Sequence, residues 1–147
     1  KLSLNRDLFM KREGLMQPAN IVARAGEQPM TAERQRDEVW QPAMKVVGDF
    51  RRAQFQLAAG KTAHYDPEDL LFRMRLWAWP GVYLDYEGRE VRVLGLEVDQ
   101  TYNVLVRYAR DGQSPERMRL VDFLKPENSC KGDSHRHGIA FVRIREL

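Results

Sequence analysis

Cysteine is almost absent from this chain, since Cys130 is the only one among 147 residues. A single thiol excludes an intramolecular disulfide framework and is typical of a reducing compartment. Long apolar runs are missing as well: the longest span only a few residues, whereas a membrane-spanning helix needs about 20. We therefore expect a cytoplasmic protein, or one inside a cytoplasmically assembled particle, without a membrane partner.

The usual catalytic signatures are also lacking. The sequence contains no glycine-rich phosphate loop, no nucleophile elbow and no Ser/His/Asp arrangement. A nuclease-type metal site needs an acid on one strand and an acid-x-lysine on the next, and no lysine follows the acids Glu97 and Asp99. We predict that the protein is not an enzyme and has no catalytic residue, cofactor or small-molecule substrate.

One short cluster carries potential metal ligands, namely Cys130, His135 and His137, with Asp133 between them. Its spacing matches none of the paired-ligand patterns of structural zinc sites, which normally have two ligand pairs. We interpret residues 130–137 as a solvated loop with incidental histidines and predict no metal. A metal protein or enzyme centred on this loop is the alternative.

The formal charge is +3, and arginine outnumbers lysine 18 to 6. The excess of positive charge lies in residues 1–60, because residues 61–147 hold 14 basic and 14 acidic side chains. Guanidinium suits bidentate contacts with carboxylate or phosphate. Arginine-rich codon usage explains the same bias, so the charge alone does not establish a nucleic-acid binder.

The first half of the chain is predicted to form an arm followed by helices. Residues 1–30 are irregular and contain Pro and Gly, which indicates an extended arm or connector. Thr31 is a suitable N-cap for a helical pattern that runs to Ala59. Pro42 predicts two helices or a kink near Trp40.

The second part of this helical pattern contains a rough apolar stripe, which we expect to face the core. The stripe consists of Met44, Val47, Phe50, Phe55 and Leu57.

Asp66 and Pro67 predict the start of another helix, as N-cap and first helical residue. Its core face carries Leu70, Leu71, Met74 and Trp77 at helical spacing.

After Pro80-Gly81 the apolar period changes from helical to two, which is typical of strands. The pattern predicts five strands near residues 82–86, 90–98, 102–108, 118–120 and 139–144. Tight turns separate the first four strands, and a bulge at Gly95 keeps Leu96 and Val98 on the face of Val91 and Val93. Residues 121–126 predict a helical turn before the last strand.

Five short strands with a helical turn before the last resemble a small SH3-like barrel. The predicted fold is therefore α+β, with an N-terminal arm and helices before a five-stranded antiparallel SH3-like barrel. We divide the chain into an arm (1–30), a helical region (31–79) and a barrel module (80–147). The resemblance is to a fold; such barrels occur in transcription elongation, ribosomal, chromatin and integrase proteins.

Arginines alternate with apolar residues along several of the predicted strands, so we expect them on the outer face of the sheet. The set is Arg92, Arg107, Arg117, Arg119, Arg143 and Arg145. Such a surface can contact phosphates. Acidic neighbours support the alternative of a mixed-charge sheet surface held by ion pairs.

These observations favour a non-enzymatic nucleic-acid-associated accessory or adaptor module that uses an arginine-bearing SH3-like barrel. The alternative is a structural subunit of a phage, plasmid or secretion-type assembly, with a protein partner or a homo-oligomer as its context. In that case the arm and the helices bind neighbours, and we expect Trp40, Phe9 and Met10 at the interface.

Overall fold

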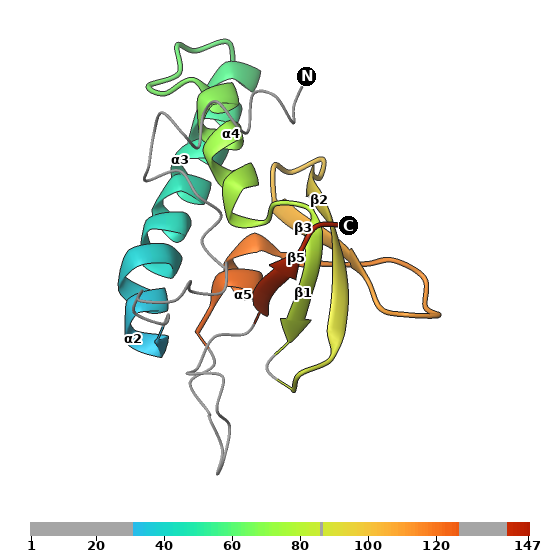
Figure 1. Ribbon diagram of the computed structural model, residues 1–147. Coiled ribbons are helices and arrows are strands. Elements are labelled where there is room, and N and C mark those ends of the chain that lie inside the picture. Colours follow the sequence, from blue (N-terminus) through green and yellow to red (C-terminus); the bar gives the residue numbers. More distant parts are fainter. Residues whose placement is uncertain (1–30, 86, 127–140) are drawn as a thin grey trace.

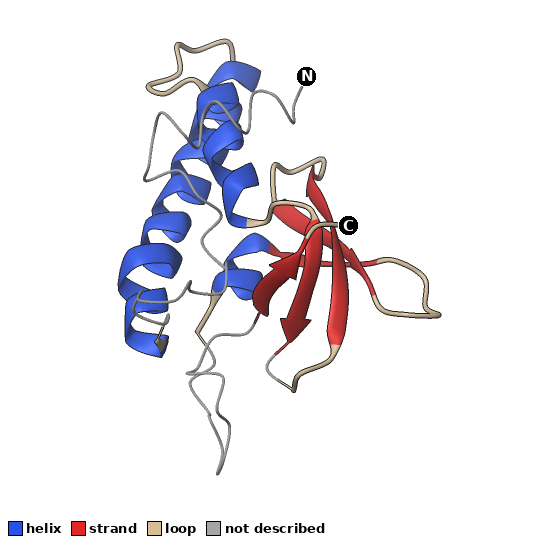
Figure 2. Ribbon diagram, in the orientation of Figure 1, coloured by secondary structure: helices blue, strands red, loops and turns tan. Residues whose placement is uncertain are grey.

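The computed structural model describes residues 31–85, 87–126 and 141–147. Helices form one layer, and a five-stranded antiparallel sheet forms the other (Figures 1 and 2). The α+β class and the antiparallel sheet predicted from the sequence are confirmed.

The first helical stretch is continuous but changes type along its length. It comprises α2 (Ala32–Arg34), the π-helical η1 (Gln35–Trp40) and α3 (Gln41–Ala58). The side chain of Thr31 accepts a hydrogen bond of 3.1 Å from the backbone N–H of Arg34, which confirms the predicted N-cap. The break expected at Pro42 appears as the change from π- to α-helix, since the N–H of Gln41 donates five residues back to Arg36.

The predicted apolar stripe of α3 is wrong in most of its members. The buried side chains are Ala43, Val46, Phe50 and Ala53. Met44, Phe55 and Leu57 are exposed, and Val47 is half-buried. The core face of helix α3 thus combines two alanines with Val46 and Phe50, and three of the five predicted residues lie outside it.

Helix α4 (Pro67–Trp77) follows the prediction. The Asp66 side chain accepts a 3.0 Å hydrogen bond from the N–H of Glu68 and caps the helix. Leu70 and Met74 are buried, and Leu71 and Trp77 pack against the same core.

The sheet has the strand order β4-β3-β2-β1-β5, so β4 and β5 are its edges. The strands are β1 (Gly81–Asp85), β2 (Glu90–Val98), β3 (Val104–Ala109), β4 (Glu116–Arg119) and β5 (Phe141–Arg145). Helix α5 (Leu120–Leu124) lies between β4 and β5 in the chain, where a helical turn was predicted. The described hydrogen bonds do not close the sheet into a barrel.

The predicted bulge in β2 is confirmed. Val93 pairs with Tyr108 of β3 and Leu96 pairs with Val106, so only one residue of β3 opposes Leu94 and Gly95. Gly95 has a φ of 134°, a conformation that suits glycine. The bulge returns Leu96 to the core face.

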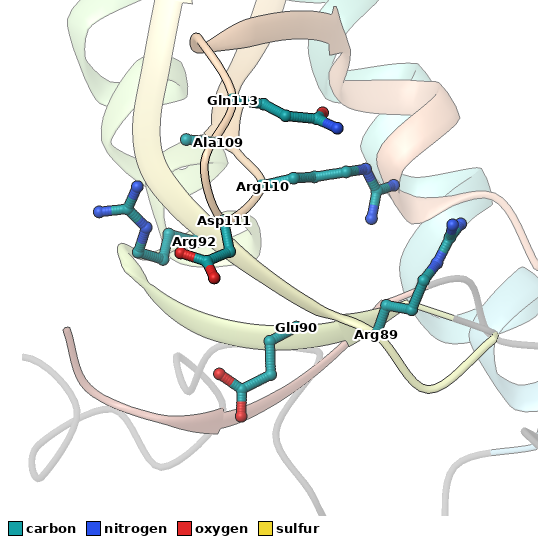
Figure 3. A pocket seen from close by; sticks show the side chains of 7 residues that line it. All are labelled: Arg89, Glu90, Arg92, Ala109, Arg110, Asp111 and Gln113. Atoms are coloured by element: carbon teal, nitrogen blue, oxygen red, sulfur yellow. The ribbon is translucent and has the colours of Figure 1, made fainter.

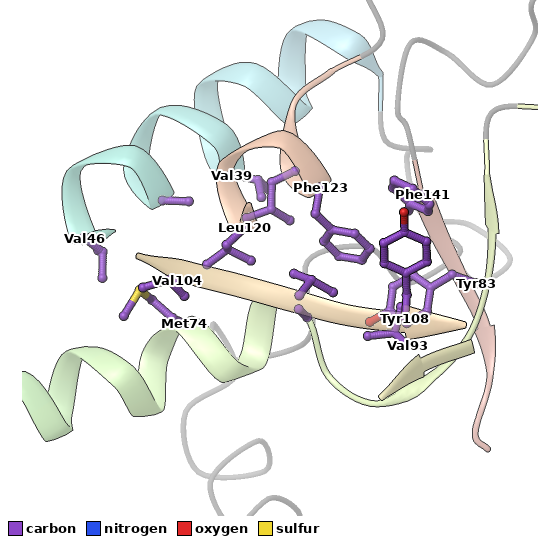
Figure 4. Close-up of a cluster of buried hydrophobic side chains, with 14 of the residues drawn as sticks. Val39, Val46, Met74, Tyr83, Val93, Val104, Tyr108, Leu120, Phe123 and Phe141 are labelled. Carbon is purple, nitrogen blue, oxygen red and sulfur yellow. The ribbon is translucent and has the colours of Figure 1, made fainter. Parts of the chain in front are cut away.

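One core joins the two layers (Figure 4). Val39 and Val46 of the helical layer belong to the same buried cluster as the strand residues Val93 and Val106. The ring of Phe123 in α5 stacks on Phe141 of β5 at 4.7 Å between centroids. The short helix therefore ties the last strand to the rest of the core.

Candidate nucleic-acid interface

The outer face of the sheet carries exposed arginines on four strands. Val104, Val106 and Tyr108 of β3 are buried, so Leu105 and Arg107 point to the opposite face. Strand pairing extends this face across the sheet, through Arg117 and Arg119 of β4, Arg92 of β2 and Arg145 of β5.

Most of these arginines are paired with carboxylates. Glu97 of β2 accepts a hydrogen bond from Arg117 and lies 3.8 Å from Arg107. The hydrogen bond from Arg117 holds the pKa of Glu97 below its usual range. Arg119 forms a two-pronged contact with Asp122 at 2.9 and 3.1 Å. This part of the face is a network of exposed ion pairs.

Arg92 of β2 and Arg145 of β5 lie on the two sides of β1, since both pair with Val82. Arg145 forms two hydrogen bonds of 2.8 and 3.1 Å with Glu90. Within the described ranges, Arg92 forms no ion pair. Arg92 is therefore the arginine of this face whose charge is least compensated.

Arg143 does not face solvent as predicted. A register shift in β5 places Arg143 opposite the buried Tyr83, and only 11% of its side chain is exposed. Its Nη2 donates to the carbonyl oxygen of Pro80 at 3.2 Å. A Cβ at Gly81 would lie 2.7 Å from Nε of Arg143, so Gly81 leaves room for this side chain. Arg143 thus connects β5 to the start of β1.

An open hollow of about 630 Å³ lies at one end of this face, between the start of β2 and the loop after β3 (Figure 3). Its lining consists of Arg89, Glu90, Arg92, Ala109, Arg110, Asp111 and Gln113. Three of these residues are cationic and two are acidic, so the lining has a small positive excess, and the buried Ala109 occupies little space. The hollow has the size of sites that hold small ligands.

A buried carboxylate binds two of the arginines that line this hollow. The side chain of Asp85 at the end of β1 is 3% exposed, and it accepts hydrogen bonds from the N–H groups of Glu87 and Arg89, both at 2.9 Å. It also binds the side chains of Arg89 at 3.2 Å and Arg110 at 2.9 Å. Burial raises the pKa of Asp85, but the hydrogen bonds from Arg89, Arg110 and Glu87 outweigh it, so the net shift is downward. Asp85 therefore remains ionised and fixes two arginines.

Arg89, Arg110 and Asp85 were not among the predicted site residues. The available signal was the position of Asp85 two residues after Tyr83, which places both side chains on the same face of β1. Once Tyr83 is recognised as buried, an aspartate on its face requires a cationic partner.

The predicted interface residue Trp40 makes an intramolecular contact. Its indole N–H donates to the carbonyl oxygen of Val121 at 2.9 Å and so joins η1 to α5. Trp40 therefore has a role within the fold, as a link between two helices. Phe9 and Met10 lie outside the described residues, as do Cys130, His135 and His137. Among the described residues, no group of three or more potential ligands is arranged to hold a metal.

No family model matches this sequence, and neither a curated protein nor a solved structure shows significant similarity to it. Within the described part of the chain, no helix is long and apolar enough to cross a membrane. Function must therefore be inferred from the outer face and its hollow.

Proposed function

We propose that the chain is a non-enzymatic accessory or adaptor module that binds nucleic acid through the outer face of its sheet. The observation that carries this proposal is the set of five exposed arginines on that face, with Glu90, Glu97 and Asp122 as their ion-pair partners. The arginines are Arg92, Arg107, Arg117, Arg119 and Arg145. Positive charge exceeds negative charge within this set, as phosphate contact requires.

The ion pairs of this face are compatible with such binding. An exposed ion pair contributes only about 0–1 kcal/mol, because water and salt screen it. A phosphate can therefore replace Glu97 as the partner of Arg107 or Arg117 at small cost, and the guanidinium retains a charge-assisted hydrogen bond. The carboxylates would also orient the arginines before the nucleic acid arrives.

We further propose that the sheet is an SH3-like barrel in its curvature. Two features support this: α5 precedes the last strand, and that strand returns to pair with β1. The bulges in β2 and β5 add local twist, which bends a sheet.

The test is fluorescence anisotropy of labelled single- and double-stranded DNA and RNA, at low and physiological salt, with sizing of the same sample. We expect log affinity to fall with log salt with a slope of about 0.7–0.9 per phosphate contacted. Arg107→Glu with Arg119→Glu should abolish binding and leave the thermal transition cooperative. The matched control is Arg36→Glu with Arg52→Glu, which reverses two exposed charges of the helical layer. Absence of binding at low salt contradicts the proposal.

One observation favours the assembly subunit as a second candidate. Phe55 and Leu57 of α3 are 49% and 48% exposed, and Met44 of the same helix is also exposed. Large apolar side chains at such exposure are common at protein interfaces. A discrete oligomer in the sizing experiment that dissociates on Phe55→Ser with Leu57→Ser, together with no affinity for nucleic acid, would support this candidate over the first.

A further inference from the structure

The hollow is lined by one arginine without an ion-pair partner among the described residues, Arg92, and by two arginines that Asp85 holds, Arg89 and Arg110. Arg92 of β2 forms no ion pair with a described residue, whereas the neighbouring Arg145 is occupied by Glu90. Arg89 and Arg110 extend on the side of the hollow opposite Arg92 (Figure 3). An elongated anion that crosses the hollow would thus meet a guanidinium on each side.

Asp85 gives Arg110 a defined orientation. Nη1 of Arg110 donates to Oδ2 of Asp85 at 2.9 Å, and the guanidinium carbon lies 6.0 Å from the centroid of the Tyr108 ring. A guanidinium has five N–H donors, so one bond to Asp85 leaves others for a ligand. Because Asp85 is buried and already accepts two backbone N–H groups, it cannot follow Arg110 to a new position. A fixed donor loses little entropy when it binds.

The remaining lining suits a nucleotide better than a bare ion. Ala109 is small and leaves space between the walls, and Gln113 and Asp111 supply an amide and a carboxylate that can meet the donors and acceptors of a base or sugar. The volume of about 630 Å³ exceeds what a single phosphate fills.

We propose that this hollow is a nucleotide subsite, in which one nucleotide of a bound nucleic-acid strand spans the hollow: its phosphate lies at Arg92, and the Asp85-oriented Arg110 on the opposite side donates to its base or sugar. This inference rests on the proposed function and names the position at which the outer face holds the strand most tightly. The ligand chemistry is a phosphate monoanion or dianion on a nucleotide.

The test uses the full chain labelled with ¹⁵N and follows backbone amide and arginine Nε–Hε signals during three titrations. The probes are a short single-stranded oligothymidine, thymidine monophosphate and inorganic phosphate. We expect saturable shifts of Arg92, Arg110 and Gln113, with the largest affinity for the oligonucleotide. Arg92→Gln should weaken oligonucleotide binding about tenfold and reduce the salt slope by about one unit.

Arg73→Gln is the matched control, because Arg73 is also exposed, lies on α4 and forms no ion pair within the described ranges. Arg110→Lys keeps the charge but removes the fork, so it should weaken binding without unfolding the protein.

Each outcome decides a separate question. If the oligonucleotide binds but Arg92→Gln behaves like Arg73→Gln, the subsite is refuted and the outer-face proposal stands. If phosphate or the mononucleotide shifts the hollow and the oligonucleotide does not bind, the hollow is a phosphate site and the nucleic-acid function fails. If no probe shifts Arg92 or Arg110, the subsite is refuted for every source of phosphate.

Discussion

Two turns of the sheet have the same pattern of aspartate-to-backbone hydrogen bonds but differ in the side chains that their aspartates bind. In the turn from β1 to β2, Asp85 accepts from the N–H groups two and four residues ahead, and in the turn from β2 to β3, Asp99 does the same. The third residue after each aspartate has a positive φ, 85° at Gly88 and 65° at Tyr102. The two turns thus share the same aspartate hydrogen bonds and the same position of positive φ.

The difference lies in the partners of each carboxylate. Asp99 is exposed, and its side-chain partners, Thr101 and Asn103, belong to its own turn. Asp85 is buried and binds Arg110, which lies 25 residues ahead in the loop between β3 and β4. The side-chain bonds of Asp99 stabilise only its own turn. The bond between Asp85 and Arg110 also fixes the position of a second loop. The first turn therefore positions the loop between β3 and β4, and the second stabilises its own hairpin.

The largest expected effect is the loss of the buried carboxylate. Asp85→Ala should lower the free energy of unfolding by about 3 kcal/mol, because two backbone N–H groups and Arg110 lose a buried partner. Asp99→Ala removes the same number of backbone contacts at an exposed site and should cost less. Urea denaturation of both variants measures the difference, and equal losses would contradict the distinction between the turns.

A change of pH addresses the same carboxylate without altering the fold. The pKa of Asp85 is lower in the folded protein than its ordinary value, so the folded state binds this proton less readily than the unfolded chain. Its stabilising contribution is complete above the unfolded pKa of about 3.9 and is lost as the pH falls through the folded pKa. The stability gap between wild type and Asp85→Asn should therefore shrink in acid. A gap independent of pH would show that folding does not shift the pKa of Asp85.

Glycine substitutions should reveal the strain in the shared turn. Gly88→Ala places a side chain at a φ of 85° and should cost about 1 kcal/mol. Gly48→Ala is the control with the opposite sign. Gly48 lies in α3, and no atom other than those of its chain neighbours and its own helix backbone lies within 4 Å of the position that a Cβ would take there. Alanine should therefore stabilise the helix by about 1 kcal/mol. Thermal unfolding measures both changes.

The smallest effect is expected when the first turn is made to resemble the second. Arg89→Asn gives Asp85 the side-chain amide that Asp99 receives from Asn103. Since 61% of the Arg89 side chain is exposed, the free energy of unfolding should change by no more than about 0.5 kcal/mol. The affinity for oligonucleotide should fall slightly with the lost charge, and anisotropy would detect that change.

Local signals predicted much of the fold. Thr31 and Asp66 cap their helices, and Gly95 marks the bulge of β2, because each depends on residues only a few positions away. The face of α3 was mispredicted because Ala43 and Ala53 make the contacts, and alanine carries little weight in an apolar pattern. Packing against other elements decided that face.

The candidate site was predictable only in part. The alternation along β3 and β4 placed Arg107, Arg117 and Arg119 on the exposed face. Arg143 turned inward because a register shift in β5 interrupts the alternation, and no glycine or proline within that strand signals it. The link between Asp85 and Arg110 crosses 25 residues, and no local spacing indicates such a pair.

The π-helical segment before Pro42 has a consequence for insertions and deletions. An ordinary α-helix advances about 100° per residue. A chain one residue shorter within 35–40 would therefore keep a helix but rotate everything upstream by that angle. Gln35, whose amide donates to the carbonyl oxygen of Leu124 at 2.9 Å, would then turn away from α5. The contact of Gln35 with the end of α5 thus fixes the rotation of this helix about its axis. The π-helical turns accommodate one residue more than an α-helix of the same length would contain.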